Sequence, residues 1–117
     1  MKVFVLGGAG YTGRVAVADL VKSERVSQVI VGDIRVKEAK QSYGKRKING
    51  KLSFQQVDLN DHQALVNSVK GCDVFANCAG PFYKTAVKAA KAAIEAGVNY
   101  VDVCDDWVPV EETLALN

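Results

Sequence analysis

The sequence has few of the side chains that bind metals or form disulfides. Its 117 residues include one histidine, His62, and three scattered cysteines, Cys72, Cys78 and Cys104. It has no Cys-x-x-Cys pair and no Cys/His cluster, so we expect no bound metal. An odd number of unclustered cysteines is typical of a reducing compartment, and the sequence therefore predicts a cytoplasmic protein.

Long apolar runs and a strong charge of one sign are missing as well. No stretch approaches the roughly 20 apolar residues that cross a bilayer, and the start, MKVFVLGG, is too short and glycine-rich for a signal peptide. The net charge of +2 favours neither a nucleic acid nor a membrane as a partner. With 49% hydrophobic and 24% charged residues, the chain is expected to form one globular domain with a buried core.

The chain alternates short apolar runs with helical patterns. The expected strands are Lys2–Leu6, Gln28–Asp33, Leu52–Asp58, Asp73–Asn77 and Asn99–Val103. The expected helices are approximately Tyr11–Val21, Lys37–Tyr43, Asp61–Lys70, Lys84–Ala96 and Val110–Leu116. This alternation predicts an α/β fold of the Rossmann type, a doubly wound parallel sheet of strand order 3-2-1-4-5 in three α/β/α layers. A sixth strand is missing, so we expect a cofactor domain cut from a longer protein.

A glycine fingerprint follows the first expected strand. Gly8, Gly10 and Gly13 form the pattern G-x-G-x-x-G between that strand and a helix. In this pattern, we expect Gly8 to make the tight turn, Gly10 to let the backbone approach a pyrophosphate and Gly13 to allow close helix packing. The backbone N–H groups and the dipole at the helix start favour a bound phosphate.

An acidic residue closes the second expected strand. Asp33 lies 20 residues after Gly13, where a carboxylate accepts hydrogen bonds from the adenosine ribose. Such a carboxylate repels a 2′-phosphate, which predicts NAD as the cofactor, with NADP as the alternative. Ile34 is expected at the same edge, and Arg35 either covers the adenine, pairs with a 2′-phosphate or is solvated. The competing interpretation is an ordinary turn with a surface aspartate.

Three further segments follow strands, at the edge where ligands bind in open α/β sheets. Asp58 either meets the adenine amino group or precedes a helix cap. The small residues in Cys78–Tyr83 either let the backbone pass beside the ribose and nicotinamide or form a simple strand-to-helix turn. Cys104–Asp106 either faces a substrate or caps the last helix.

The remaining basic, histidine and cysteine side chains are expected to have no role in catalysis. The basic run Lys45–Lys47 is expected to be a solvated loop. His62 is expected to be exposed rather than catalytic. No base lies near Cys78 or Cys104 in the sequence, so we interpret both as small strand-end residues rather than nucleophiles.

Two motifs resemble the saccharopine dehydrogenase-like family. They are GGAGYTGR and the more specific CAGPFYKTAVKAAKAAIEAGVNYVDVCDDW, and the resemblance extends over nearly all 117 residues. It implies that residues 1–117 are the N-terminal NAD(P)-binding domain of a two-domain oxidoreductase. Such enzymes transfer a hydride to or from an amino acid or secondary amine, and the C-terminal domain completes the substrate site and a homodimer.

The resemblance also implies roles for individual residues. It places Asp33 at the ribose, and it assigns two further groups, one at the pyrophosphate and one at the nicotinamide. The first group is Gly8, Gly10, Tyr11, Thr12 and Gly13; the second is Ala79, Gly80 and Pro81. No residue is identified as the proton-transfer group. The alternative function is a stand-alone regulatory domain that binds NAD without catalysis, and the second motif favours the oxidoreductase.

Overall fold

Strands and helices alternate strictly along the chain in the computed structural model, which describes residues 1–44 and 50–117. The expected basic loop at Lys45–Lys47 lies outside the described residues. The elements are β1 (Lys2–Leu6), α1 (Tyr11–Leu20), β2 (Gln28–Asp33), α2 (Val36–Tyr43), β3 (Leu52–Gln56), α3 (His62–Val69), β4 (Val74–Asn77), α4 (Phe82–Ala96), β5 (Asn99–Asp102) and α5 (Trp107–Leu114).

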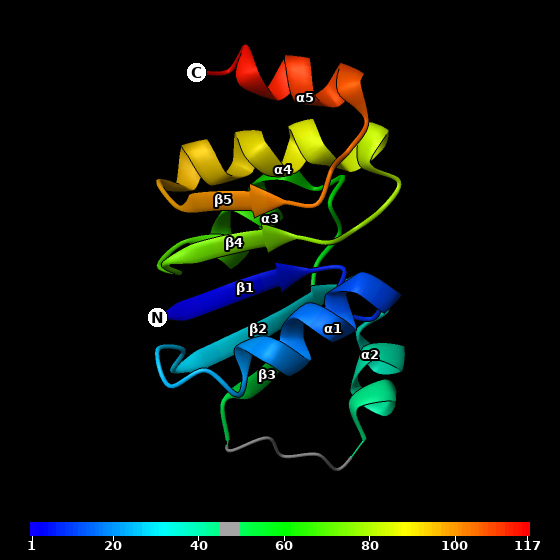
Figure 1. The fold of residues 1–117 in the computed structure, drawn as a ribbon, viewed down its shortest axis with the longest axis vertical. Helices are drawn as coiled ribbons and strands as arrows, with labels where there is room; N and C mark the ends of the chain where they lie inside the picture. The colour runs from blue at the N-terminus through cyan, green and yellow to red at the C-terminus, as the bar shows by residue number, and fades with distance from the viewer. Residues whose placement is uncertain (45–49) are drawn as a thin grey trace.

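The strands form one parallel sheet in the order β3-β2-β1-β4-β5, which confirms the predicted Rossmann-type topology (Figure 1). The central strand β1 pairs with β2 on one side and β4 on the other, so that Val5 lies between Val31 and Ala76. All carboxyl ends of the strands therefore meet at one edge of the sheet. In folds of this type, ligands bind at this edge, beside the central strands where the strand order reverses.

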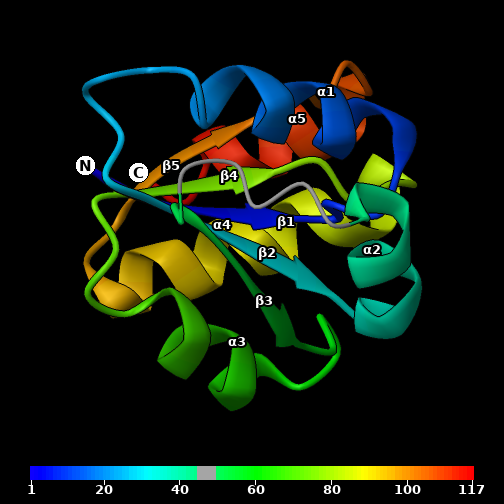
Figure 2. The ribbon, with the colours of Figure 1, turned by 90° about the horizontal axis from the view of Figure 1, so that it is seen from below.

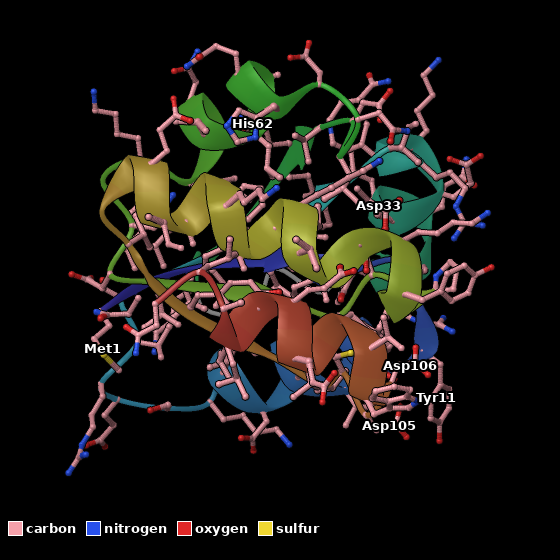
Figure 3. All side chains as sticks on the ribbon, turned by 90° about the horizontal axis from the view of Figure 1, so that it is seen from above. Met1, Tyr11, Asp33, His62, Asp105 and Asp106 are labelled. Carbon is pink, nitrogen blue, oxygen red and sulfur yellow. The ribbon has the colours of Figure 1, made fainter. Side chains whose placement is uncertain are left out.

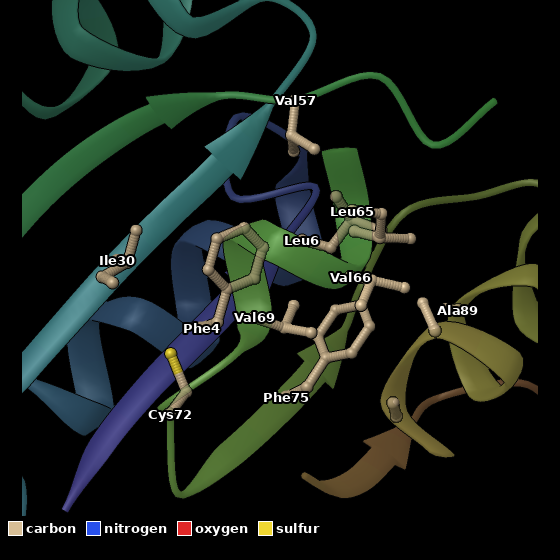
Figure 4. Packing of buried hydrophobic residues seen from close by; sticks show 12 residues of the cluster. Phe4, Leu6, Ile30, Val57, Leu65, Val66, Val69, Cys72, Phe75 and Ala89 are labelled. Atoms are coloured by element: carbon tan, nitrogen blue, oxygen red, sulfur yellow. The ribbon is translucent and has the colours of Figure 1, made fainter. Parts of the chain in front are cut away.

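Each face of the sheet carries its own hydrophobic core. Helices α1 and α2 cover one face, and α3 and α4 cover the other; Figure 2 shows α1 and α3 on opposite sides. Most residues of the first core are valines, and β-branched side chains suit buried parallel strands. The second contains Phe4, whose ring packs edge-on against that of Phe75 with centroids 5.7 Å apart (Figure 4).

Local signals in the sequence explain several element ends. Asp61 caps α3 by accepting a hydrogen bond from the N–H of Ala64. Gly97 ends α4 in the left-handed conformation, at φ 68°, as the sequence predicts. Strand β3 ends at Gln56, two residues before the predicted end at Asp58. Its edge position agrees with its mixed polar and apolar residues.

The last helix differs most from expectation. It begins at Trp107 rather than at Val110, so that Pro109 lies in its first turn. Proline is tolerated there because the first N–H groups of a helix have no intrahelical acceptor. Helix α5 packs against α4 beyond the β5 edge of the sheet and leaves Trp107 and Leu114 about 70% exposed (71% and 70%).

Candidate functional site

A cavity of about 280 Å³ opens at the carboxyl edge of the sheet. It lies at the ends of β1, β2 and β4, the position that the topology predicts. Seven of the predicted site residues line it: Gly10, Asp33, Ile34, Arg35, Asp58, Ala79 and Gly80. Five predicted residues do not form its lining: Gly8, Tyr11, Thr12, Gly13 and Pro81. Residues of the lining that the sequence reasoning missed include Gly7, Asn60 and Thr85.

The turn after β1 depends on Gly7, which corrects the expectation that Gly8 makes it. Gly7 has φ 78°, a left-handed backbone conformation that residues other than glycine rarely adopt. Its N–H donates to the carbonyl of Gly32 at 2.8 Å, and its carbonyl accepts the N–H of Gly10 at 3.0 Å. Gly7 immediately precedes the G-x-G-x-x-G pattern, so the fingerprint alone gave no reason to choose it.

The three fingerprint glycines have different surroundings. A Cβ on Gly8 would lie 2.4 Å from Cγ1 of Val31, and a Cβ on Gly13 would lie 2.3 Å from the carbonyl oxygen of Gly7. Both positions therefore exclude a side chain because of close packing, which agrees with the predicted role of Gly13. A Cβ on Gly10 would have only that same carbonyl oxygen nearby, at 3.3 Å. Gly10 is also the one fingerprint glycine on the cavity wall.

The N-terminus of α1 offers unpaired N–H groups beside the cavity. Gly10 occupies the N-cap position and has no side chain to cap the helix, and the first turn has no acidic residue. Within the described residues, the N–H groups of Tyr11, Thr12 and Gly13 have no hydrogen-bond acceptor. Such a helix start attracts an anion through both its N–H groups and its dipole.

Asp33 has a buried carboxylate whose two oxygens both accept backbone hydrogen bonds. Its Oδ2 accepts from the N–H of Ala9 at 3.1 Å, and its Oδ1 accepts from the N–H of Arg35 at 2.9 Å. The Asp33 side chain is only 7% exposed, whereas that of Arg35 is 66% exposed, with Nε 4.0 Å from Oδ1 of Asp33. Of these two charged groups, the guanidinium of Arg35 is therefore the one accessible to a ligand.

Tyr43, which the sequence analysis did not identify, holds the glycine loop through a hydrogen bond. Its hydroxyl donates to the carbonyl of Gly8 at 2.8 Å and is buried. This burial raises the pKa of Tyr43 to about 12. The available signal was an aromatic residue at the end of α2, which a buried helix face also explains.

The turn after β4 is fixed by two side chains that the sequence reasoning also missed. The N–H of Ala79 donates to Oδ1 of Asn77 at 3.0 Å, and Oγ1 of Thr85 donates to the Ala79 carbonyl at 2.6 Å. Asn77 is fully buried and Thr85 is nearly so. Both backbone polar groups of Ala79 are thus satisfied internally, and Ala79 and Gly80 present a small, smooth wall to the cavity.

The Asp58 side chain bonds within its own loop, where Oδ1 accepts from the N–H of Asn60 at 2.8 Å. The segment Cys104–Asp106 does not line this cavity. Asp106 occupies the N-cap position of α5, but its side chain makes no capping hydrogen bond. Cys104 instead lines a second cavity of about 210 Å³ between β5, α4 and α5.

Two remaining candidates for catalysis, His62 and Cys78, lack the surroundings of a catalytic residue. His62 is exposed and its Nε2 lies 2.6 Å from Oε2 of Glu95, away from Asp33 (Figure 3). Burial raises the pKa of the Cys78 thiol, which disfavours the nucleophilic thiolate.

The described residues contain no group of three histidine, cysteine, aspartate or glutamate side chains that could hold a metal ion. Among the helices in residues 1–44 and 50–117, none has the length and apolarity needed to cross a bilayer.

Comparison with protein families gives a match over almost the whole chain. Residues 3–115 match the family described as the saccharopine dehydrogenase NADP binding domain. The match includes the glycine fingerprint, Asp33 and the turn at Ala79, which all border the cavity except for Gly8 and Gly13.

Solved structures share the fold at low sequence identity. Apo saccharopine dehydrogenase (L-Glu forming) from Saccharomyces cerevisiae matches 95% of this chain with a TM-score of 0.77 and 20% identity, over 23% of its own length. Triphenylmethane reductase from Citrobacter sp., complexed with NADP(H), matches 97% of this chain with a TM-score of 0.74 and 19% identity, over 45% of its length. The NADPH-dependent quinone oxidoreductase from Escherichia coli, complexed with NADPH, matches 97% of this chain with a TM-score of 0.73 and 19% identity, over 44% of its length. This chain thus spans less than half of each of these structures.

Proposed function

Because this chain belongs to the family of saccharopine dehydrogenase NADP-binding domains, we propose that its main cavity binds a nicotinamide dinucleotide. The observation that carries the proposal is the uncapped start of α1, whose free N–H groups lie behind Gly10 at the cavity wall. Phosphate oxygens satisfy such N–H groups, and a glycine at this position leaves room for them. The pyrophosphate would lie there, with the adenosine toward Arg35 and the nicotinamide toward Ala79.

We propose NADP rather than NAD as the preferred cofactor. The sequence predicts NAD because of Asp33, but that carboxylate is buried and already accepts two backbone hydrogen bonds. Arg35 lines the same cavity and exposes its guanidinium. A guanidinium forms strong paired hydrogen bonds with a phosphate. The description of the family, which names NADP, supports the same preference.

The substrate of the proposed oxidoreductase is an amino acid or a secondary amine. When bound, the cofactor would supply or accept the hydride at its nicotinamide ring. This chain would contribute one wall of the reaction site through Ala79 and Gly80, which lack polar side chains that compete for the substrate. Hydride transfer also needs a positioned substrate and the exclusion of water. We propose that a second domain of a longer, homodimeric protein provides these.

Titration with NADPH and NADH tests the proposed cofactor and its preference. We expect the wild-type chain to bind NADPH at least tenfold more tightly than NADH, because one charge-assisted pair contributes roughly 1.5–3 kcal/mol. Arg35→Gln should remove that difference. Arg25→Gln is the matched control, since Arg25 lies before the amino end of β2, on the opposite edge of the sheet.

Results of three kinds would each contradict a part of the proposal. If neither NADPH nor NADH binds the wild-type chain, the cavity is excluded as a cofactor site. Equal affinity for NADH and NADPH in the wild-type chain would leave the site intact but show that Arg35 does not select the 2′-phosphate, and tighter binding of NADH would return Asp33 to the role that the sequence predicts. A protein that contains this domain and binds NADPH, but oxidises or reduces no amine or amino acid, would favour the regulatory alternative.

A further inference from the structure

A hydrogen-bonded network of polar groups connects the loops that follow β4 and β5; within it Asn77 is buried, and Tyr100 and Asp102 are partly buried. Asn77 accepts the N–H of Ala79 on Oδ1 at 3.0 Å and donates from Nδ2 to the hydroxyl of Tyr100 at 3.3 Å. The Tyr100 hydroxyl donates to Oδ2 of Asp102 at 2.8 Å. Oδ1 of Asp102 accepts the N–H of Cys104 at 3.1 Å. Three side chains thus join two backbone N–H groups on neighbouring loops.

Hydrogen-bond chemistry and distances assign the donors and acceptors of this network. The Ala79 N–H requires an oxygen from Asn77, so the amide nitrogen of Asn77 must face Tyr100. The Tyr100 hydroxyl accepts from that nitrogen and gives its single proton to the Asp102 carboxylate, the shorter of its two possible acceptor contacts. Burial raises the pKa of Tyr100 well above its ordinary value, so the hydroxyl keeps this proton at neutral pH.

The packing of the sheet holds these groups in place. Asn77 and Asp102 are register partners at the ends of β4 and β5, as are Phe75 and Tyr100. The rings of Phe75 and Tyr100 pack edge-on with centroids 5.5 Å apart. A hydrogen-bonded network on such a frame restricts the arrangement of the two loops. Of these two loops, the one at Ala79 lines the main cavity.

We propose that Asn77, Tyr100 and Asp102 are positioning residues that orient the nicotinamide half of the cofactor. They touch no ligand themselves but hold the turn at Ala79 against the loop at Cys104. The inference rests on the proposed cofactor site and extends it. It also gives a function to Tyr100 and Asp102 in strand β5, which line the second cavity and not the main one.

Tyr100→Phe is the principal test, because it removes the hydroxyl and keeps the ring that packs on Phe75. Two probes are titrated: NADPH, and adenosine 2′,5′-bisphosphate, which lacks the nicotinamide. We expect Tyr100→Phe to weaken NADPH binding roughly three- to tenfold, as the loss of one or two hydrogen bonds does. The affinity for adenosine 2′,5′-bisphosphate should stay unchanged, because the adenosine half lies at Asp33 and Arg35.

A second variant guards against a general loss of stability. Asp102→Asn keeps the shape of the side chain but presents an N–H donor to one of its two present donors. It should likewise weaken the binding of NADPH and not that of adenosine 2′,5′-bisphosphate. Asp73→Asn is the matched control: Asp73 also accepts a backbone hydrogen bond, from Lys2 at 2.6 Å, but at the opposite edge of the sheet. It should change neither affinity.

Amide hydrogen exchange in the free chain gives an independent measurement. Tyr100 touches neither the Ala79 N–H nor the Cys104 N–H, yet Tyr100→Phe should speed exchange at both. If exchange at both amides and the ratio of the two affinities stay at wild-type values, the positioning role is wrong, although the cofactor site stands. If the wild-type chain binds no NADPH, the proposed function itself is wrong.

Discussion

Oδ2 of Asp33 accepts a hydrogen bond from the backbone N–H of Ala9 at 3.1 Å. This contact joins the end of β2 to the glycine loop, two segments 24 residues apart in the chain. The carboxylate therefore shapes the cavity before any ligand enters. A residue that the sequence assigns to the ribose alone also stabilises the fold.

Replacing Asp33 by asparagine should lower the free energy of unfolding by about 1–3 kcal/mol. The amide nitrogen of asparagine cannot accept, so either the Ala9 N–H or the Arg35 N–H loses its buried acceptor. Urea unfolding monitored by circular dichroism measures the change. Asp19→Asn, at an exposed position on α1, is the control. An unchanged free energy of unfolding in Asp33→Asn would mean that these hydrogen bonds contribute nothing to stability.

Two glycine-to-alanine variants should separate packing from binding. In Gly13→Ala, the new Cβ would lie 2.3 Å from the carbonyl oxygen of Gly7, so the melting temperature should fall strongly. In Gly10→Ala, the nearest atom would lie at 3.3 Å, and the fold should survive. Its methyl group would occupy the space of the phosphates, and NADPH affinity should fall roughly tenfold or more, about 1.4 kcal/mol. Thermal melts and calorimetric titration measure both effects; wild-type NADPH affinity in a folded Gly10→Ala chain would contradict the site.

Alkaline pH should destabilise the fold through Tyr43. Its ordinary pKa of 10.0 applies to the unfolded chain, and burial raises the folded value to about 12. The stability that this group contributes is complete below pH 10 and is lost as the pH rises toward 12, because the unfolded state then binds fewer protons. Between about pH 9 and about pH 11, Tyr43→Phe should lose roughly 1.4 kcal/mol less than the wild-type chain. Urea unfolding at both pH values measures this; identical losses would mean that Tyr43 titrates normally in the fold.

Cofactor binding should protect one cysteine selectively. Cys78 lines the main cavity, whereas Cys104 lines the second one. NADPH should therefore slow the alkylation of Cys78 by iodoacetamide and leave that of Cys104 unchanged. Mass spectrometry of the labelled peptides measures both rates in one sample. Equal protection of both cysteines would point to a general tightening of the fold instead of occupancy of this cavity.

Local patterns predicted the secondary structure well where short-range physics governs it. The buried runs Val3–Leu6 and Val29–Val31 have the composition of inner parallel strands, and both are strands. Gly97 ended a helix because a residue in the left-handed conformation is needed there. The predicted start of α5 lies three residues after the observed one, since a proline in the first turn is compatible with more than one helix start.

The sequence by itself determined the topology and the edge of the sheet at which the cavity opens, because strand–helix alternation with a glycine fingerprint allows few arrangements. Only the tertiary structure decided how Asp33, Gly7, Tyr43 and Asn77 act. Each of them bonds to a group brought close by strand pairing or helix packing: Asp33 to Ala9, Gly7 to Gly32, Tyr43 to Gly8 and Asn77 to Tyr100. A buried polar atom must find such a partner, and its identity depends on which segments meet in space rather than on neighbouring residues in the chain.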